Sequence, residues 1–329
     1  LDDFYRGGLA RQISKGLAEH DSPLRLSDFE NYRAKKVTPL SLSTSLGELY
    51  NLPAPTQGIS SLMILGLFDR LNVKEANGFD HIHGLVEATK QAFLLRNSHV
   101  CDPEYMSVNP QDWLESDFLD HLCKKIDMKE AKPWPYEEKP GDTIWMGCAD
   151  QEGRVVSFIQ SIYWEYGSGF VVPETGIVWQ NRGMSFSLEE THFNRLEPKK
   201  RPFHTLNPAL ARFKDGRTLA YGTMGGEGQP QTQAALYSRY AYFNTPLQQA
   251  ISQPRWLLGR TWGDESTTLK LESRFDNNLV SKLKEAGHDV EMLDEYTSVM
   301  GHAGAVCVQP DGIIEGANDP RSDGACIAL

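Results

Sequence analysis

Residues 140–163 read PGDTIWMGCADQEGRVVSFIQSIY, and they divide the chain into two differently patterned parts. Before this stretch, apolar residues recur mainly at helical spacing. From Thr143 onward, residues 143–149 and 154–163 are rich in β-branched and aromatic residues, as strands are. The stretch therefore predicts a β-hairpin that follows a mostly helical segment.

The loop of this hairpin determines which side chains face each other. Residues 151–153, Gln-Glu-Gly, fit a three-residue loop that ends with glycine in the left-handed conformation. Asp150 then pairs with Arg154, and Thr143 lies opposite Ser161 on the same sheet face. A two-residue loop would instead turn Ser161 to the other face, so the juxtaposition depends on the register.

Thr143 is our candidate nucleophile. A threonine that begins a strand is ordinary by itself, and its hydroxyl is a poor nucleophile without a base. Cleavage between Asp142 and Thr143 would give Thr143 a free α-amine, of which roughly a sixth is neutral at pH 7. This amine can accept the hydroxyl proton, and Ser161 can orient the hydroxyl. Residues 129–142 are charged and proline-containing, which indicates an exposed connector suited to cleavage.

Two further motifs carry polar groups to the ends of predicted strands. Gly225 and Gly226 follow a strand, and such glycines can direct two N–H groups into a cleft as an oxyanion hole. Taken alone, the pair is more often a plain turn, and it lacks the Gly-Lys-Ser/Thr of a phosphate-binding loop. His204 and Thr205 precede another strand and can line a site, although a lone histidine is equally often structural.

The remaining pattern predicts an α+β fold in which helices pack outside antiparallel sheets. Further hairpins are expected at residues 208–223 and 304–317. Helical spacing marks residues 1–20, 59–71, 81–99, 112–125, 231–243, 246–253 and 276–286.

Charge and composition argue against several classes of partner. The chain has 329 residues, with 33 basic and 44 acidic side chains and a net charge of -11, which disfavours nucleic acid and anionic membranes. No apolar run reaches the roughly eighteen residues of a membrane span. The five cysteines are scattered without disulfide or zinc spacing, which favours a reducing, cytoplasmic location. We expect no metal and no cofactor. The first residues lack an initiator methionine and a signal-peptide pattern, so an upstream segment is expected.

Together these features resemble the γ-glutamyltransferase family of N-terminal-nucleophile hydrolases along the whole chain. The resemblance implies a four-layer αββα sandwich of antiparallel sheets flanked by helices. It also implies cleavage into two subunits, with residues 1–142 as the C-terminal part of the large subunit and residues 143–329 as the small one. Six segments carry it: Asp3-Phe4-Tyr5-Arg6-Gly7, residues 53–58, Gly167-Ser168-Gly169, Lys200-Arg201-Pro202, Gly225-Gly226 and Asp319-Pro320-Arg321-Ser322.

The same resemblance implies roles for the catalytic residues. Thr143 is the nucleophile that begins the small subunit, and Ser161 matches the residue that hydrogen-bonds to it. Gly225 and Gly226 supply the oxyanion donors. No cofactor takes part.

The substrate pocket departs from the family pattern. The acidic partner expected for a substrate ammonium is missing, and Arg182 stands beside its place. Tyr163 replaces a smaller asparagine. His204 and Thr205 replace a pair of serines. These changes argue against an α-amino-acid substrate and favour a small anionic amide, whose carboxylate Arg182 and His204 would hold.

Within the family, residues 141–145 and 222–230 look most like the oxamate amidohydrolases of purine (allantoin) breakdown, which implies hydrolysis of oxamate to oxalate and ammonia. Two alternatives stay open. One is γ-glutamyl transfer or acylase action on larger amides, and the other is an unprocessed homologue without activity. The expected partners are the amide substrate and the two subunits themselves, with further dimerisation left open.

Overall fold

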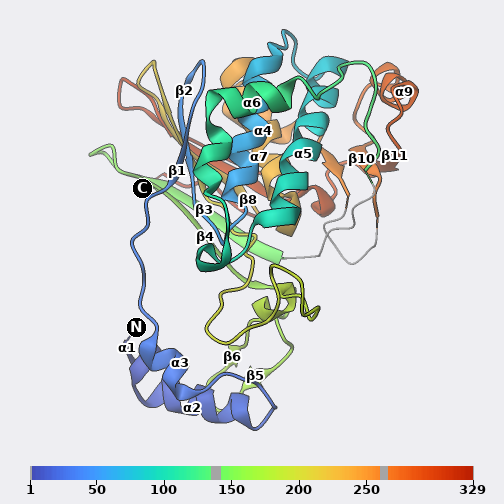
Figure 1. The fold of residues 1–329 in the computed structure, drawn as a ribbon. Helices are drawn as coiled ribbons and strands as arrows, with labels where there is room; N and C mark the ends of the chain where they lie inside the picture. The colour runs from blue at the N-terminus through green and yellow to red at the C-terminus, as the bar shows by residue number, and fades with distance from the viewer. Residues whose placement is uncertain (1, 135–141, 260–265, 329) are drawn as a thin grey trace.

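A six-stranded antiparallel sheet forms the core of the main body (Figure 1). The computed structural model describes residues 2–134, 142–259 and 266–328. Three hairpins from distant parts of the sequence supply the sheet, in the order β1-β2-β7-β8-β12-β13. The strands are β1 (Leu40–Ser43), β2 (Gly47–Asn51), β7 (Ala209–Phe213), β8 (Thr218–Thr223), β12 (Ala303–Val308) and β13 (Ile314–Asn318).

A layer of helices covers one face of this sheet (Figure 1). Helix α4 (Gly58–Leu71) packs on β1 and β2, and α7 (Gln229–Tyr237) packs on β8 and β12. Helices α5 (Phe79–His99) and α6 (Ser116–Cys123) pack on α4 in turn. Both α4 and α5 are buried on every side over most of their length, which is typical of helices in the centre of a large core.

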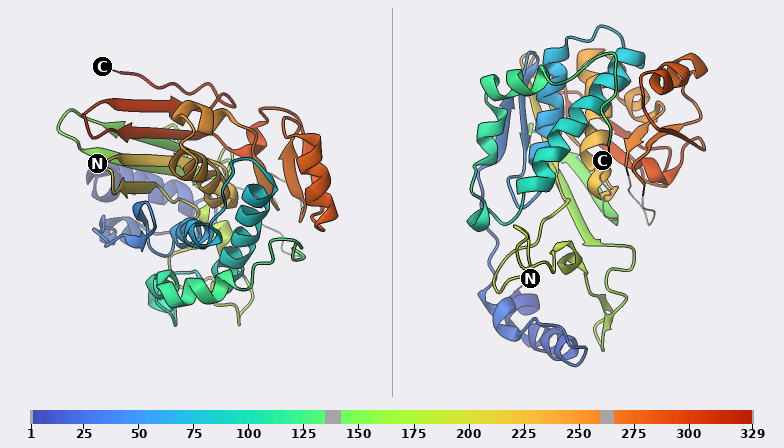
Figure 2. Two further views of the ribbon diagram at one scale, coloured as in Figure 1. Left: turned by 90° about the horizontal axis from the view of Figure 1, so that it is seen from above. Right: turned by 45° about the vertical axis from the view of Figure 1, so that its right-hand side comes forward.

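The predicted hairpin lies against the opposite face of the main sheet (Figure 2). Strands β3 (Asp142–Ala149) and β4 (Val155–Tyr163) pair with each other, and β3 packs on β8 and β12. Tyr221 of β8 contacts Tyr237 of α7 on the helical side. Its neighbour Gly222 therefore faces the hairpin, because adjacent strand residues point to opposite faces.

The Trp145 side chain joins the hairpin to the sheet through a pair of glycines. Gly222 and Gly304 are direct partners in β8 and β12. A Cβ atom on Gly222 would lie 2.1 Å from Trp145 Cδ1, and one on Gly304 would lie 2.5 Å from Trp145 Cζ3. The indole N–H donates to Ser157 Oγ at 2.9 Å. The ring thus rests on bare backbone, and a side chain at either glycine would occupy its place.

Two smaller units complete the described chain. Helices α1 (Asp2–Arg6), α2 (Gly8–Ala18) and α3 (Leu26–Asn31) share a separate apolar cluster with β5 (Val171–Val172), and β5 pairs with β6 (Ile177–Val178). Figure 1 shows this unit apart from the main body. The second unit is a sheet in the order β11-β10-β9. Its members and the adjoining helices are β9 (Trp256–Leu258), β10 (Leu269–Glu272), β11 (Val290–Leu293), α8 (Leu247–Ser252) and α9 (Asn277–Glu285).

The α+β class predicted from the sequence is confirmed, with one exception in detail. Strands β10 and β11 run parallel, because α9 lies between them as a crossover helix. This pair is an exception to the expected antiparallel sheets, whereas the main sheet is antiparallel as expected. The helix layer, the main sheet and the β3–β4 hairpin correspond to an α layer followed by two β layers. The expected connector falls partly on residues 135–141, which lie outside the described residues.

The outer face of the hairpin is apolar and exposed. Ile144 is 54% exposed and Phe158 is 44% exposed, and Met146, Val156 and Ile162 share this face. The inner residues Trp145 and Ile159 are less exposed, so the strands alternate as an antiparallel pair with one covered face does. No helix among the described residues is both long enough and apolar enough to cross a bilayer.

The packing of Trp145 predicts that Gly222→Ala or Gly304→Ala will each destabilise the protein by about 1–3 kcal/mol, because the new methyl group would overlap the indole ring and displace it. Chemical denaturation measures the change. Gly8→Ala is the control, because its new Cβ would have no atom nearer than 3.9 Å. That variant should be neutral or slightly stabilising. Equal stability of the Gly222→Ala and Gly8→Ala variants would contradict this account of the interface.

Candidate active site

Thr143 lies at an irregular point of the β3–β4 ladder. From Ala149↔Val155 to Ile144↔Gln160 the register is the one predicted, and Asp150 N–H donates to Arg154 O at 3.1 Å. Gly153 has the expected left-handed conformation, with φ +78°. The next pair is Asp142↔Tyr163, so Thr143 faces two residues of β4 instead of one. This β-bulge, which the prediction lacked, is of the kind that redirects a side chain at a sheet edge.

Ser161 and Ile162 lie opposite Thr143 in this bulge, and Tyr163 follows them at the end of β4. Tyr163 N–H donates to Ser161 Oγ at 2.8 Å, which orients the serine hydroxyl. Tyr163 has φ +84°, a conformation that is strained for an aromatic residue. Its side chain is only 1% exposed. The end of β4 is therefore held in an unusual conformation beside the candidate nucleophile.

An open cavity of about 350 Å³ adjoins Thr143. Thr143 Oγ1 is itself shielded from solvent. The proposed pocket residues Tyr163, Arg182 and His204 do not line this cavity, so it extends away from them. Its lining consists of Thr143, Ile144, Gln160, Ser161, Ile162, Trp164, Glu165 and Tyr166.

Arg182 lies buried between Tyr163 and Thr205. It begins the short 3₁₀ helix η3 (Arg182–Ser185), and its guanidinium carbon lies 3.9 Å from the centre of the Tyr163 ring. Nη1 donates to Thr205 Oγ1 at 3.1 Å, whereas Nη2 is buried and has no hydrogen-bond partner among the described residues. Burial lowers the pKa of Arg182 to about 10, so the group stays charged at neutral pH. Such a group is suited to bind an anion.

His204 is held next to Arg182 but carries no charge. The backbone N–H of His204 donates to Pro55 O at 2.8 Å. Burial, and secondarily the charge of Arg182, lower the pKa of His204 to about 3. The Nδ1 atom accepts from Leu206 N–H at 3.5 Å, which places the ring proton on Nε2. Of the two residues expected to hold a carboxylate, Arg182 therefore carries the charge, and His204 can contribute a neutral hydrogen bond.

Gly225 and Gly226 form the turn between β8 and α7. Gly225 has φ +117° and Gly226 has φ +52°, which glycine adopts without the strain of a Cβ atom. Gly228 N–H donates to Gly225 O at 2.9 Å, and Gly226 begins the 3₁₀ turn η4 (Gly226–Gly228), which continues into α7. N–H groups at a helix start lack intrahelical acceptors and can bind negative charge.

A buried network behind this turn was missed in the sequence. Gln57, Arg96 and Glu227 come from three distant segments, and Gln57 and Arg96 are almost wholly buried. Arg96 Nη2 pairs with Glu227 Oε2 at 2.9 Å. Their spacing in the sequence does not indicate that they are neighbours. The one available signal was Glu227, a charged residue directly after two glycines.

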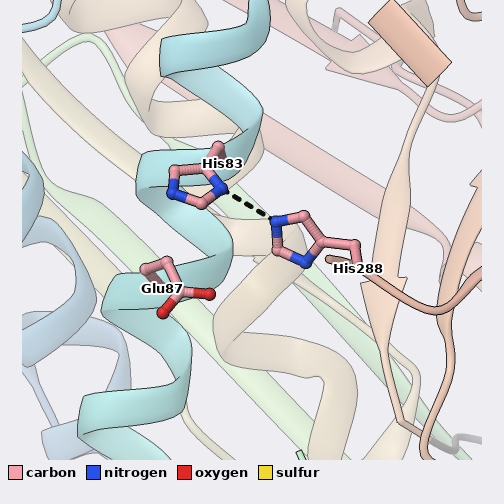
Figure 3. A group of neighbouring side chains, drawn as sticks. All are labelled: His83, Glu87 and His288. Carbon is pink, nitrogen blue, oxygen red and sulfur yellow. Dashed lines mark hydrogen bonds between the residues drawn. The ribbon is translucent and has the colours of Figure 1, made fainter. Parts of the chain in front are cut away.

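One group among the described residues has the types and proximity of metal ligands: His83, Glu87 and His288 (Figure 3). His83 Nδ1 and His288 Nε2 lie 2.8 Å apart in a hydrogen bond, and His83 Nε2 bonds to Asp127 O at 2.7 Å. Lys90 Nζ lies 2.6 Å from Glu87 Oε1. Because Lys90 already supplies the positive charge beside Glu87, we interpret the group as a structural polar cluster of the core.

Comparison with known proteins gives a consistent similarity along the chain. The model of the gamma-glutamyltranspeptidase family matches residues 1–329. The oxamate amidohydrolase proenzyme of Klebsiella pneumoniae is 53% identical over 325 residues, covering 99% of this chain and 62% of that protein. The glutathione hydrolase-like YwrD proenzyme of Bacillus subtilis is 39% identical, again covering 99% and 62%. The chain thus spans less than two thirds of the length of these relatives.

The fold is also similar to that of a solved acylase. The cephalosporin acylase from Bacillus halodurans superposes with a TM-score of 0.89 at 31% identity, covering 98% of this chain and 59% of that one. The arrangement of main sheet, hairpin and helix layer is therefore similar to that of this acylase.

The neutral state of His204 predicts a loss of stability in acid. Its pKa of about 3 lies below the ordinary value of 6.5, so the unfolded chain binds the extra proton as the pH falls between these values. This contribution to stability is complete above pH 6.5, and between pH 7.5 and 5.0 up to about 2 kcal/mol of it is lost.

His204→Asn should reduce that acid loss by a similar amount, as measured by denaturation at both pH values. His121→Asn, on the exposed face of α6, is the matched control and should follow the wild type. An unchanged acid loss in His204→Asn would show that His204 does not stay neutral in the native state.

Proposed function

The chain belongs to the gamma-glutamyltranspeptidase family, and we propose that it is an amidohydrolase with Thr143 as an N-terminal nucleophile. The observation that carries the proposal is the position of Thr143 at the β3–β4 bulge, where Ser161 lies opposite and an open cavity adjoins. Cleavage after Asp142 would release its α-amine as the base. The backbone of Asp142 begins β3.

The proposed reaction proceeds through an acyl-enzyme. Thr143 Oγ1 attacks the carbonyl carbon of the amide while the α-amine of Thr143 takes the hydroxyl proton. The N–H groups of Gly225 and Gly226 stabilise the oxyanion, and the amine returns the proton to the leaving nitrogen, so that ammonia departs. Water then attacks the threonine ester with the amine again as base, and the carboxylic acid product leaves. Ser161 orients the hydroxyl through its own fixed position.

Arg182 supports an anionic substrate. Its buried Nη2 has no acceptor among the described residues, and a substrate carboxylate would supply one. Tyr163 fills space beneath the guanidinium, Thr205 holds Nη1, and the neutral His204 can donate from Nε2. Oxamate has a carboxylate directly beside its amide carbonyl. A relative that is 53% identical is named an oxamate amidohydrolase proenzyme, and we infer the same substrate here, with oxalate as the product.

A second candidate is hydrolysis or γ-glutamyl transfer on larger amides. The cavity beside Thr143 measures about 350 Å³, more space than oxamate needs. Other relatives are named glutathione hydrolase-like proenzyme and cephalosporin acylase. Comparison of ammonia release from oxamate with p-nitroaniline release from a γ-glutamyl anilide separates the two candidates. The enzyme should prefer oxamate if Arg182 and Tyr163 define the pocket.

We infer that the mature protein consists of two subunits, produced by cleavage of the peptide bond between Asp142 and Thr143. Residues 1–142 would belong to the large subunit and residues 143–329 to the small one. The main sheet takes β1 and β2 from the first part and β7, β8, β12 and β13 from the second, so cleavage would leave the subunits interlocked. The extra length of the relatives would belong to the same two-subunit protein.

Thr143→Ala in the full-length protein is expected to abolish both cleavage and amidase activity, because the methyl group cannot attack either carbonyl. Thr143→Ser keeps the hydroxyl and should retain part of both functions. Mass spectrometry of the subunits and ammonia release measure the outcome. A Thr143→Ala protein that still splits at this bond, or still releases ammonia, would refute the proposed nucleophile.

Arg182→Met is expected to raise KM for oxamate by about 10–100-fold, which corresponds to the 1.5–3 kcal/mol of a charge-assisted hydrogen bond. The effect on an uncharged small amide should be far smaller. Arg201→Met is the control, because the Arg201 side chain is 41% exposed and pairs with Asp102. If the oxamate and neutral-amide KM values rise equally in Arg182→Met, the carboxylate is not bound by Arg182.

A further inference from the structure

Gln57 connects the two loops that carry the candidate oxyanion donors and the candidate anion site. It lies directly before α4 and is fully buried. Its Nε2 donates to Thr205 O at 2.9 Å and to Gly226 O at 2.8 Å. Its backbone N–H donates to His204 O at 3.0 Å. A single side chain thus spans two segments that are otherwise about twenty residues apart in the sequence.

The contact to Gly226 restrains a turn that has little rigidity of its own. Both glycines have positive φ angles, and no side chain on either restricts rotation of the peptides. The Gly225–Gly226 peptide is held at its carbonyl by Gly228 N–H at 2.9 Å. The following peptide is held at its carbonyl by Gln57. Because carbonyl and N–H point oppositely in a trans peptide, the first of these bonds directs the Gly226 N–H away from the helix start.

Arg96 fixes Gln57 from behind. Arg96 Nη1 donates to Gln57 Oε1 at 2.9 Å, and Nη2 pairs with Glu227 Oε2 at 2.9 Å. Its guanidinium carbon also lies 3.7 Å from the centre of the Phe93 ring on α5. Gln57 therefore uses both amide hydrogens and its oxygen, and its amide can be placed only one way round. Because Glu227 is part of the glycine turn, its pairing with Arg96 links Arg96 back to that turn.

We propose that Gln57 is a positioning residue that holds the turn bearing the Gly225 and Gly226 N–H groups in place relative to the Arg182–Thr205 anion site. This inference rests on the proposed function, in which these N–H groups stabilise the oxyanion. Gln57 touches no substrate. It acts by keeping the Gly226–Glu227 peptide and the Thr205 carbonyl at a fixed separation, so that one amide holds both halves of the pocket.

Gln57→Glu tests the two donated hydrogen bonds with almost no change of shape. The carboxylate keeps its acceptor for Arg96 but faces the carbonyl oxygens of Thr205 and Gly226 without a hydrogen to share. Gln57→Met removes donor and acceptor alike and provides a second variant without the added charge. We expect kcat to fall by about 10–100-fold in both, and KM for oxamate to change by less than about threefold, because misplaced oxyanion donors weaken the transition state more than substrate binding.

Gln231→Glu is the matched control. Gln231 is equally buried, on α7, and its amide bonds to both backbone groups of Leu258, away from the turn. A general loss of stability from a buried carboxylate should appear in both Glu variants, whereas the kcat loss should appear only at position 57. Activities are compared per mole of cleaved subunit, so that slower maturation is not counted as slower turnover.

Hydrogen exchange of residues 222–228, followed by mass spectrometry, gives a readout that does not depend on activity and leaves out the control position. Faster exchange of this segment in the Gln57 variants than in Gln231→Glu, together with the kcat loss, supports the proposal. Unchanged exchange, or a kcat loss matched by Gln231→Glu, overturns it. A wild-type protein without amidase activity would refute the proposed function first, and unchanged exchange would then separately refute the restraint by Gln57.

Discussion

The contact between the Trp145 indole and the paired glycines of β8 and β12 anchors the β3–β4 hairpin on the main sheet. Gly222 and Gly304 are register partners, so neighbouring positions on two strands both lack a side chain and expose the backbone there. The Trp145 ring occupies that area, and Ser157 accepts its N–H. Thr143 lies two residues away on the same strand face. A packing feature of the sheet thus decides where a reactive hydroxyl is held, and β8 continues from the same glycine towards Gly225.

Unusual backbone conformations are concentrated around this point. The bulge opposite Thr143, the positive φ of Tyr163 and the positive φ angles of Gly225 and Gly226 all lie at strand ends that converge on the candidate site. Each is stabilised by a specific neighbour. Ser161 accepts from the Tyr163 N–H, Arg182 stacks on the Tyr163 ring, and Gln57 and Gly228 hold the glycine turn. Such clustering is typical of functional sites, where surrounding contacts maintain a conformation that the local sequence disfavours.

Much of this arrangement follows from local sequence patterns, and the rest depends on contacts that such patterns do not encode. Alternation and loop length were sufficient to predict the β3–β4 register from residue 144 to residue 160. The bulge at Thr143 was not predictable, because it lies at the end of the ladder, beyond the residues whose register the loop and the alternation determine. The neutrality of His204 comes from burial beneath distant segments, and Gln57 is significant only because residues near positions 205 and 226 fold against it. The parallel pairing of β10 and β11 was also not predicted, because it depends on how α9 crosses between the two strands.

The buried charge of Arg182 lowers the stability of the protein, whereas binding of an anionic substrate would depend on that charge. Its burial lowers the pKa to about 10, which means that the native state bears a cost for the charge that unfolding would relieve. Tyr163 and Thr205 offset part of this cost, but Nη2 lacks an acceptor among the described residues. A bound carboxylate would remove the remaining deficit, whereas a neutral amide would leave it in place. The site would therefore select anions chiefly because Arg182 Nη2 has no acceptor among the described residues until a substrate binds. Selection for stability alone would not keep a buried donor in this state.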